Sequence, residues 1–187
     1  MKNLTDQQII ESILKGNNAD FALLVDRYKD RAFSLLKRML KNEMDAEEAL
    51  QDAFLKMFNS LKDFRAESKF STWFYKIVFN TALTIISKKK RQVENQMLSI
   101  DDEFDLSDDQ EVYSNSKDGK QFILKMVDKL PPRNALVVIL FYIDNFSLDE
   151  ISKVLDISIV NTKVLLHRSR NALREILIKH NYHEEIL

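Results

Sequence analysis

The sequence predicts an all-α fold, with two small helical domains joined by an acidic flexible linker. The 187 residues include only two Gly and two Pro, too few for a fold rich in tight turns. Apolar residues recur with helical spacing over most of the chain. This periodicity disappears at about residues 93–116, where acidic residues accumulate and little apolar surface remains to order the segment. We therefore expect domains at residues 1–92 and 117–187.

The composition restricts the class of protein. With 45% hydrophobic and 30% charged residues, the chain has an ordinary globular composition. The absence of cysteine excludes disulfides and thiolate metal sites. The start, MKNLTDQQII, has no apolar signal region, and the longest apolar run, residues 135–143, is too short to span a bilayer. We therefore expect a cytoplasmic protein without membrane insertion.

The net charge of −1 conceals an uneven distribution. Residues 1–100 carry 17 basic and 13 acidic side chains, residues 101–128 carry 3 and 9, and residues 129–187 carry 8 and 7. An acidic middle thus masks a basic first half, so the net charge does not exclude a nucleic-acid partner.

Two helices are expected at the start of the first domain. Thr5 and Gln8 have the spacing of a capping box, and Gly16 is expected to end the helix that they begin. The second helix is expected from near Asp20 to about Leu40, because apolar residues recur along one face of it.

The third helix is the most regular element and has an acidic outer face. Its apolar residues keep helical spacing as far as Leu61, and we expect Asp45 to cap it. Acids in a first helical turn offset the helix dipole, but Asp52 lies beyond that turn. The acidic residues of this face can therefore stabilise the helix and also bind a partner. Its exposed members are expected to be Asp45, Glu47, Glu48, Gln51 and Asp52.

Residues 64–91 combine aromatic side chains with seven Lys or Arg and one acid. Aromatic rings stack on unpaired bases and cations neutralise phosphates, so this composition suits single-stranded nucleic acid. The alternative is structural, since Phe74 and Val78 fall on the face of a helix that packs into a core. Trp73 lies at the border of that face, and the polar loop Arg65–Lys69 precedes the helix. The run Lys88–Arg91 has a plain interpretation as a solvated helix end.

The second domain is expected to contain a helix-turn-helix of the tri-helical, winged-helix-like type. A helix from near Lys117 stops at two prolines, and an almost wholly apolar helix follows as far as about Ile143. Ser147 and Glu150 form a second capping-box pattern. A three-residue turn, residues 156–158, then leads into a helix ending near Lys179, which would lie in the major groove.

The polar face of this last helix is suited to DNA. Asn161 and Lys163 are placed to reach base edges, and the basic residues that follow are placed to hold phosphates. The alternative is a solvated helix, because tri-helical domains that bind no DNA share the spacing. The phosphate candidates are His167, Arg168, Arg170 and Arg174.

Three stretches resemble the extracytoplasmic-function (ECF) group of sigma factors in the sigma-70 superfamily. FRAESKFSTWFYKIVFN is similar to the segment that captures and melts the −10 promoter element, and DAEEALQDAF to the segment that docks on the polymerase β′ clamp helices. LPPRNALVVILFYIDNFSLDEISKVLDISIVNTKVLLHRSR is similar to the domain that reads the −35 element. The resemblance extends over about residues 20–178.

The resemblance implies the partners and their binding residues. The partners would be core RNA polymerase, through the β′ clamp helices and the β flap, promoter DNA, and an anti-sigma factor where one exists. The acidic face would bind the polymerase. The −10 element would contact Arg65, Ser68, Lys69, Trp73, Lys76, Asn80, Lys88, Lys89 and Arg91. The −35 element would contact Ser158, Asn161, Thr162, Lys163, His167, Arg168 and Arg170.

Several positions depart from the family pattern. Thr84 and Ser87 stand where an Asp and an Arg are usual, and the usual turn Gly is Asp156. Uncharged residues replace basic ones at three further positions, which predicts fewer phosphate contacts and a weak intrinsic −35 affinity. These three are Ala135, Phe141 and Leu165.

Other classes of function explain less of the chain. An enzyme would need a glycine-rich phosphate loop or a set of catalytic side chains, and we find neither, nor a cofactor motif. His180 and His183 lack a third metal ligand, so we expect no metal site. A stand-alone helix-turn-helix regulator would use only the last 60 or so residues, and a helical polymerase-binding adaptor would use only DAEEALQDAF.

Overall fold

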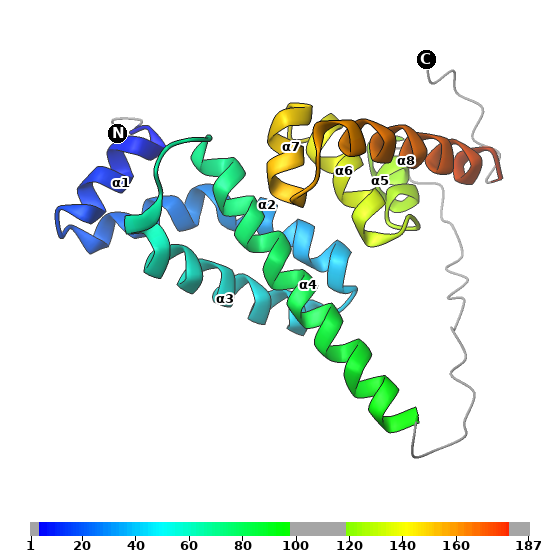
Figure 1. Cartoon of the computed structure of the whole chain (residues 1–187), viewed down its shortest axis with the longest axis horizontal. Helices are drawn as coiled ribbons and strands as arrows, with labels where there is room; N and C mark the ends of the chain where they lie inside the picture. The colour runs from blue at the N-terminus through cyan, green and yellow to red at the C-terminus, as the bar shows by residue number, and fades with distance from the viewer. Residues whose placement is uncertain (1–3, 98–118, 180–187) are drawn as a thin grey trace.

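The computed structural model describes residues 4–97 and 119–179, and in these ranges the chain is helical with no strand. Figure 1 shows the helices in two groups, α1–α4 and α5–α8, that lie against each other. The all-α prediction is confirmed, and the second group has no strand to form a wing in its described part. Most of the expected linker, residues 98–116, lies outside the described residues, as do His180 and His183.

The first group contains four α-helices and two short 3₁₀ turns. Their bounds are α1 Asp6–Leu14, η1 Asn18–Asp20, α2 Phe21–Leu40, α3 Glu43–Ser60, η2 Leu61–Asp63 and α4 Phe70–Met97. The first capping box is confirmed, because the side chains of Thr5 and Gln8 each accept from the other's backbone N–H. Gly16 follows α1 with φ of +100°, a conformation that favours glycine. The helix α4 continues to Met97, so residues 93–97 of the expected linker are helical.

The cap of α3 was predicted wrongly. Asn42, not Asp45, is the capping residue, and its side chain accepts the backbone N–H of Asp45 at 3.0 Å. Lys41, in the left-handed region with φ of 52°, ends α2 and turns the chain so that α3 begins two residues later. The side chain of Asp45 is therefore released from capping and pairs with Lys89 of α4.

The second group contains four helices, and the residues that begin and end them are largely those predicted. Their bounds are α5 Gly119–Val127, α6 Pro132–Tyr142, α7 Leu148–Leu155 and α8 Ile159–Lys179. Pro132 occupies the first turn of α6, where its missing N–H costs no helix hydrogen bond. The capping box of Ser147 and Glu150 is confirmed at the start of α7. Asp156 ends α7 in the left-handed conformation, with φ of 54° and ψ of 49°.

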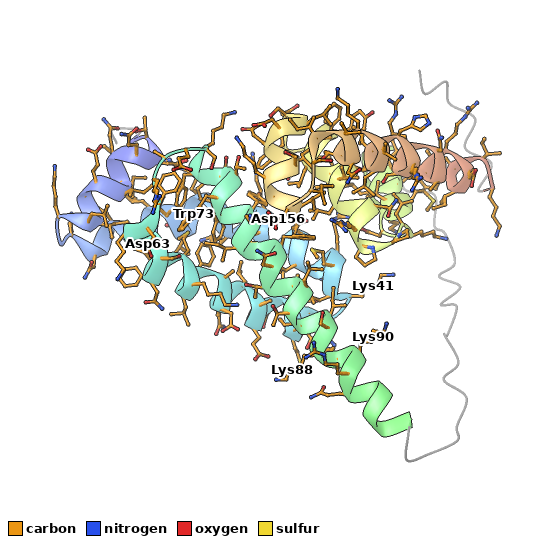
Figure 2. The ribbon with its side chains drawn as sticks, viewed as in Figure 1. Lys41, Asp63, Trp73, Lys88, Lys90 and Asp156 are labelled. Carbon is orange, nitrogen blue, oxygen red and sulfur yellow. The ribbon has the colours of Figure 1, made fainter. Side chains whose placement is uncertain are left out.

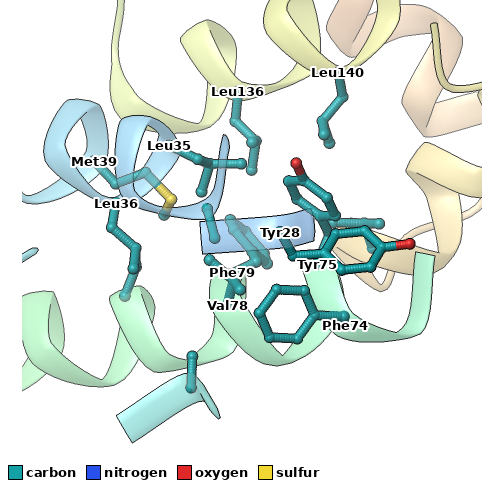
Figure 3. Close-up of a cluster of buried hydrophobic side chains, with 14 of the residues drawn as sticks. Tyr28, Leu35, Leu36, Met39, Phe74, Tyr75, Val78, Phe79, Leu136 and Leu140 are labelled. Atoms are coloured by element: carbon teal, nitrogen blue, oxygen red, sulfur yellow. The ribbon is translucent and has the colours of Figure 1, made fainter. Parts of the chain in front are cut away.

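One continuous hydrophobic core joins the two groups. Figure 3 shows side chains of α2, α4 and α6 in a single cluster, with Leu136 and Leu140 of α6 facing Leu35 of α2 and Tyr75 of α4. In addition, α7 packs along the N-terminal half of α4, and the ring of Tyr75 meets that of Phe146 edge to face at 5.3 Å. The two predicted domains are therefore packed on each other in this structure.

Candidate nucleic-acid and protein interfaces

The acidic face lies on the outer side of α3 and is accessible. Glu47, Glu48, Gln51 and Asp52 are exposed, whereas Asp45 is partly buried by its ion pair with Lys89. The carboxylates of Glu47, Glu48 and Asp52 have no ion-pair partner among the described residues. This face therefore presents uncompensated negative charge to a cationic or amide-rich partner.

Two exposed apolar side chains lie on the same face and were not among the predicted binding residues. Met44 is 80% exposed and Leu55 is 61% exposed, and both fall at helical spacing with Glu48 and Gln51 on the outer side. The sequence pattern could have identified them, because neither residue falls on the apolar face of α3 that is buried. An exposed apolar pair beside unpaired acids is typical of a surface that a protein partner covers.

The loop Arg65–Lys69 and the start of α4 form an aromatic platform, consisting of Phe64, Phe70 and Trp73. The Trp73 ring lies 5.2 Å from that of Phe64 and 5.6 Å from that of Phe70, and the indole is partly buried. Ala66, in the loop, has φ of 55°, an uncommon conformation for a residue with a side chain. The two ring contacts hold the indole in place, and the exposed cations Arg65 and Lys69 lie in the loop just before α4.

The structure spreads six of the nine predicted −10 residues along α4 and leaves the other three, Arg65, Ser68 and Lys69, in the loop before it. Steps of 100° per residue place Trp73, Lys76, Asn80 and Arg91 on one line of the helix. Figure 2 shows Trp73 near one end of α4 and Lys88 toward the other. The helical rise over the residues between them amounts to about 22 Å along the axis. Lys89 lies apart from this line, because it faces α3 and pairs with Asp45.

Two cations of this predicted surface are paired with carboxylates of the second group. The Nζ atom of Lys69 lies 2.9 Å from Glu150, and that of Lys76 lies 2.8 Å from Asp156. Figure 2 shows Asp156 beside α4. Burial acts to raise the pKa of Glu150, but hydrogen bonds from Ser147 and Lys69 outweigh it and lower the pKa. The pKa of Asp156 is also lowered, by its hydrogen bond to Lys76 and by the charge of that residue.

Two buried hydroxyls lie on the face of α4 that turns toward the second group. Thr72 is one helical turn from both Lys69 and Lys76, and Tyr75 contacts Phe146. Within the described part of the chain, neither the Thr72 nor the Tyr75 hydroxyl has a hydrogen-bond partner. Burial raises the pKa of Tyr75, which keeps the phenol protonated. A buried unpaired hydroxyl is costly, so this contact between the groups is imperfect.

The helix α8 presents most of the predicted −35 residues to solvent. Asn161, Lys163, His167, Arg168 and Arg170 are exposed. Ser158 caps the helix, because its hydroxyl accepts the N–H of Asn161 at 3.1 Å.

Thr162 is placed differently from the other −35 candidates. Its side chain is fully buried, and its hydroxyl donates to the carbonyl of Ser158 at 3.0 Å. This residue holds the first turn of α8 together rather than forming part of the exposed surface.

The three uncharged positions in the second group pack into the core. Ala135 is buried, and Phe141 and Leu165 are partly buried against the hydrophobic cluster. Each therefore adds apolar contact to the core.

No group of three or more His, Cys, Asp or Glu is arranged to hold a metal ion in residues 4–97 and 119–179. No described helix combines the length and the apolar character that crossing a bilayer requires.

Family models match both groups of helices. The model of sigma-70 region 2 matches residues 24–92, and the model of sigma-70 region 4 matches residues 121–173. The chain is 34% identical over 181 residues to the ECF RNA polymerase sigma factor SigW of Bacillus subtilis, covering 90% of this chain and 94% of that protein. It is 29% identical over 180 residues to the ECF RNA polymerase sigma-E factor of Escherichia coli, covering 92% and 94%.

Two solved structures share the fold. CnrH, in complex with the cytosolic domain of CnrY, superposes with a TM-score of 0.65 at 19% identity, over 93% of this chain and 97% of CnrH. The sigma factor RpoE of Bartonella quintana, in complex with the anti-sigma factor NepR, also gives 0.65, at 20% identity, over 84% of this chain and 96% of RpoE.

Proposed function

The chain belongs to the ECF group of RNA polymerase sigma factors, and on that premise we propose that it directs promoter-specific initiation by core RNA polymerase. The observation that carries the proposal is that sigma-70 region 2 and sigma-70 region 4 both match this one chain, in that order. The factor performs no chemistry itself and works where the polymerase works, in the cytoplasm.

Core polymerase binding is assigned to α3. The unpaired carboxylates of Glu47, Glu48 and Asp52, with Gln51, would meet the β′ clamp helices. Met44 and Leu55 extend this surface, because each offers exposed apolar area to the same partner. The second domain would contact the β flap, which holds it at the upstream element.

Capture of the −10 element is assigned to the aromatic platform and the line of residues along α4. Unstacking a base costs a few kcal/mol, and stacking on an aromatic ring returns about 1–3 kcal/mol. The half-buried indole of Trp73 offers one such ring at a fixed position. Lys69 and Lys76 would hold the adjacent phosphates once they are released from Glu150 and Asp156.

Recognition of the −35 element is assigned to the exposed face of α8. Asn161 and Lys163 are accessible in its first turns and would meet base edges, while Arg168 and Arg170 would hold phosphates. The packing of the two domains implies that they separate before both elements are bound together. An anti-sigma factor is also proposed as a partner, because the solved structures of CnrH and of Bartonella quintana RpoE are complexes with CnrY and NepR.

Run-off transcription tests the proposal. Core RNA polymerase from the host is assayed with and without the protein on a genomic promoter library, and co-elution with the core is measured in parallel. Promoter-specific transcripts that require the protein are the expected result. Co-elution without transcripts would favour the adaptor, and DNA binding without co-elution would favour a stand-alone regulator. The match of region 2 to residues 24–92 speaks against the regulator.

A control variant separates binding from folding. Glu48→Lys and Asp52→Lys together reverse the exposed charge of α3, and we expect them to abolish co-elution. Lys62→Glu changes an exposed residue beyond the end of α3 and should leave co-elution unchanged. Equal losses in both proteins would count against the acidic face as the docking surface.

A further inference from the structure

The centre of the outward face of α8 is apolar. Val160 is 68% exposed and Val164 is 42% exposed, and they lie one turn apart. Steps of 100° per residue place both opposite the buried side of the helix, which is formed by Thr162, Leu166 and Ser169. Valine is a poor helix former, and nothing in the described part of the chain covers these two side chains.

Polar and basic side chains flank the two valines on both edges of the helix. Asn161 and Arg168 lie on one edge, and Lys163 and His167 lie on the other. The first acid of α8 is Glu175, four turns from its start. The face is thus an apolar ridge bordered by positive charge.

The charge distribution around the ridge indicates which kind of partner binds it. The major groove of DNA has phosphates along both walls, and the only apolar groups on its floor are thymine methyls. A ridge with cations on both edges is complementary to that arrangement. A protein groove built to take the same ridge would need acidic residues on both rims.

We propose that Val160 and Val164 read thymine methyl groups in the upstream promoter element. The proposal deepens the proposed function, on which it rests, by specifying which base feature α8 recognises. The two side chains are separated by about 6 Å along the helix, which corresponds to about two base-pair steps. The element should therefore contain thymines about two base pairs apart, on either strand, at the positions that α8 contacts.

The first experiment removes the methyl groups and leaves every hydrogen-bonding group in place. Holoenzyme, reconstituted with the host's core polymerase, first selects its upstream element from promoter DNA with randomised upstream positions. Each thymine of that element is then replaced by deoxyuridine, one at a time. We expect the affinity to fall about fourfold at each of two positions and to stay unchanged at the others.

Matched variants connect the effect to the two valines. Val160→Ala and Val164→Ala remove methyl contacts at exposed positions where alanine favours the helix. Each variant should lose the response to deoxyuridine at one of the two positions and keep it at the other. Ile178→Ala is the control, because Ile178 is 51% exposed on the same line of the helix but five turns away.

The outcomes distinguish this inference from the proposed function. A selected element whose binding is indifferent to deoxyuridine would overturn the inference and leave the proposed function intact. Loss of core binding in Val160→Ala, with an unchanged response to deoxyuridine, would assign the ridge to a protein partner and also overturn it. Selection of no upstream sequence at all would overturn −35 recognition itself, and this inference with it.

Discussion

Thr72 and Thr162 are both buried, but only the hydroxyl of Thr162 forms a hydrogen bond within the described residues. The hydroxyl of Thr162 donates to the carbonyl of Ser158, whereas that of Thr72 has no partner among the described residues. The energetic consequences are opposite, because a paired buried hydroxyl stabilises the fold and an unpaired one costs about 1–3 kcal/mol.

This contrast predicts opposite effects of the same substitution. Thr72→Val removes an unpaired polar atom at nearly constant volume and should raise the free energy of unfolding by about 1 kcal/mol. Thr162→Val removes a hydrogen bond and should lower it by about 1 kcal/mol. Urea unfolding monitored by circular dichroism measures both. A destabilised Thr72→Val protein would show that this hydroxyl has a partner in solution.

Trp73→Ala removes the ring assigned to base stacking and should reduce open-complex formation about 5- to 150-fold, the equivalent of about 1–3 kcal/mol. Core binding should be unaffected, because Trp73 is on α4 and the acidic face is on α3. Permanganate footprinting of the −10 region and co-elution are the two measurements. Trp73→Phe keeps an aromatic ring and should retain most of the activity, whereas equal losses in both assays would indicate misfolding.

The helical periodicity of the sequence predicted the burial of Trp73 but not that of Thr72. The 100° periodicity placed Trp73 at the border of the buried face, and the structure shows it partly buried. By the same periodicity Thr72 shares a face of α4 with the polar residues Lys76 and Asn80, yet Thr72 is buried. Periodicity identifies the face on which a residue lies, but it does not reveal that a distant helix, α7, covers that face.

At the scale of elements, the start of α3 shows how local signals compete. The run NEMDAEE contains two capping residues, Asn42 and Asp45, three positions apart. Both have side chains suited to a cap, and the sequence does not decide between them. In the structure Asn42 is extended, with φ of −141°, and caps the helix. The two capping boxes were predicted correctly from the spacing of their paired side chains.

The identity of this cap can be measured. Asn42→Ala should lower the free energy of unfolding by about 1 kcal/mol, because it leaves the N–H of Asp45 without its acceptor. Asn42→Asp should retain most of the stability. Thermal unfolding measures both variants. An Asn42→Ala protein as stable as the parent would restore Asp45 as the capping residue.

At the scale of the whole molecule, the packing of the two domains was beyond the reach of the sequence. Tyr75 and Leu136 were expected to be apolar residues of separate domains, and each would fit a core of its own. Instead they share one core, joined across the interface by Tyr75 and Phe146 and by the ion pairs of Lys69 and Lys76. Contacts between residues about 60–80 positions apart leave no periodic signal along the chain.

The interface predicts a response to charge reversal. Asp156→Lys places a cation opposite Lys76, and we expect the population with separated domains to rise about fivefold. Because the chain has no cysteine, dyes on cysteines introduced at the exposed residues Asn59 and Asn171 report the distance between domains by energy transfer.

A second substitution provides the control for this measurement. Lys76→Glu in the Asp156→Lys background restores opposite charges and should restore the closed population. An unchanged energy-transfer efficiency in Asp156→Lys would show that the pair of Lys76 and Asp156 does not contribute to the closed state.

The pairing of Lys69 and Lys76 with internal carboxylates has a consequence for ionic strength. Both cations are at least partly exposed, so dissolved salt screens their pairs with Glu150 and Asp156 and favours separation of the domains. Salt also weakens the contacts of the same cations with DNA phosphates. The two effects oppose each other, so transcription directed by this factor should peak at an intermediate salt concentration rather than decline steadily from the lowest.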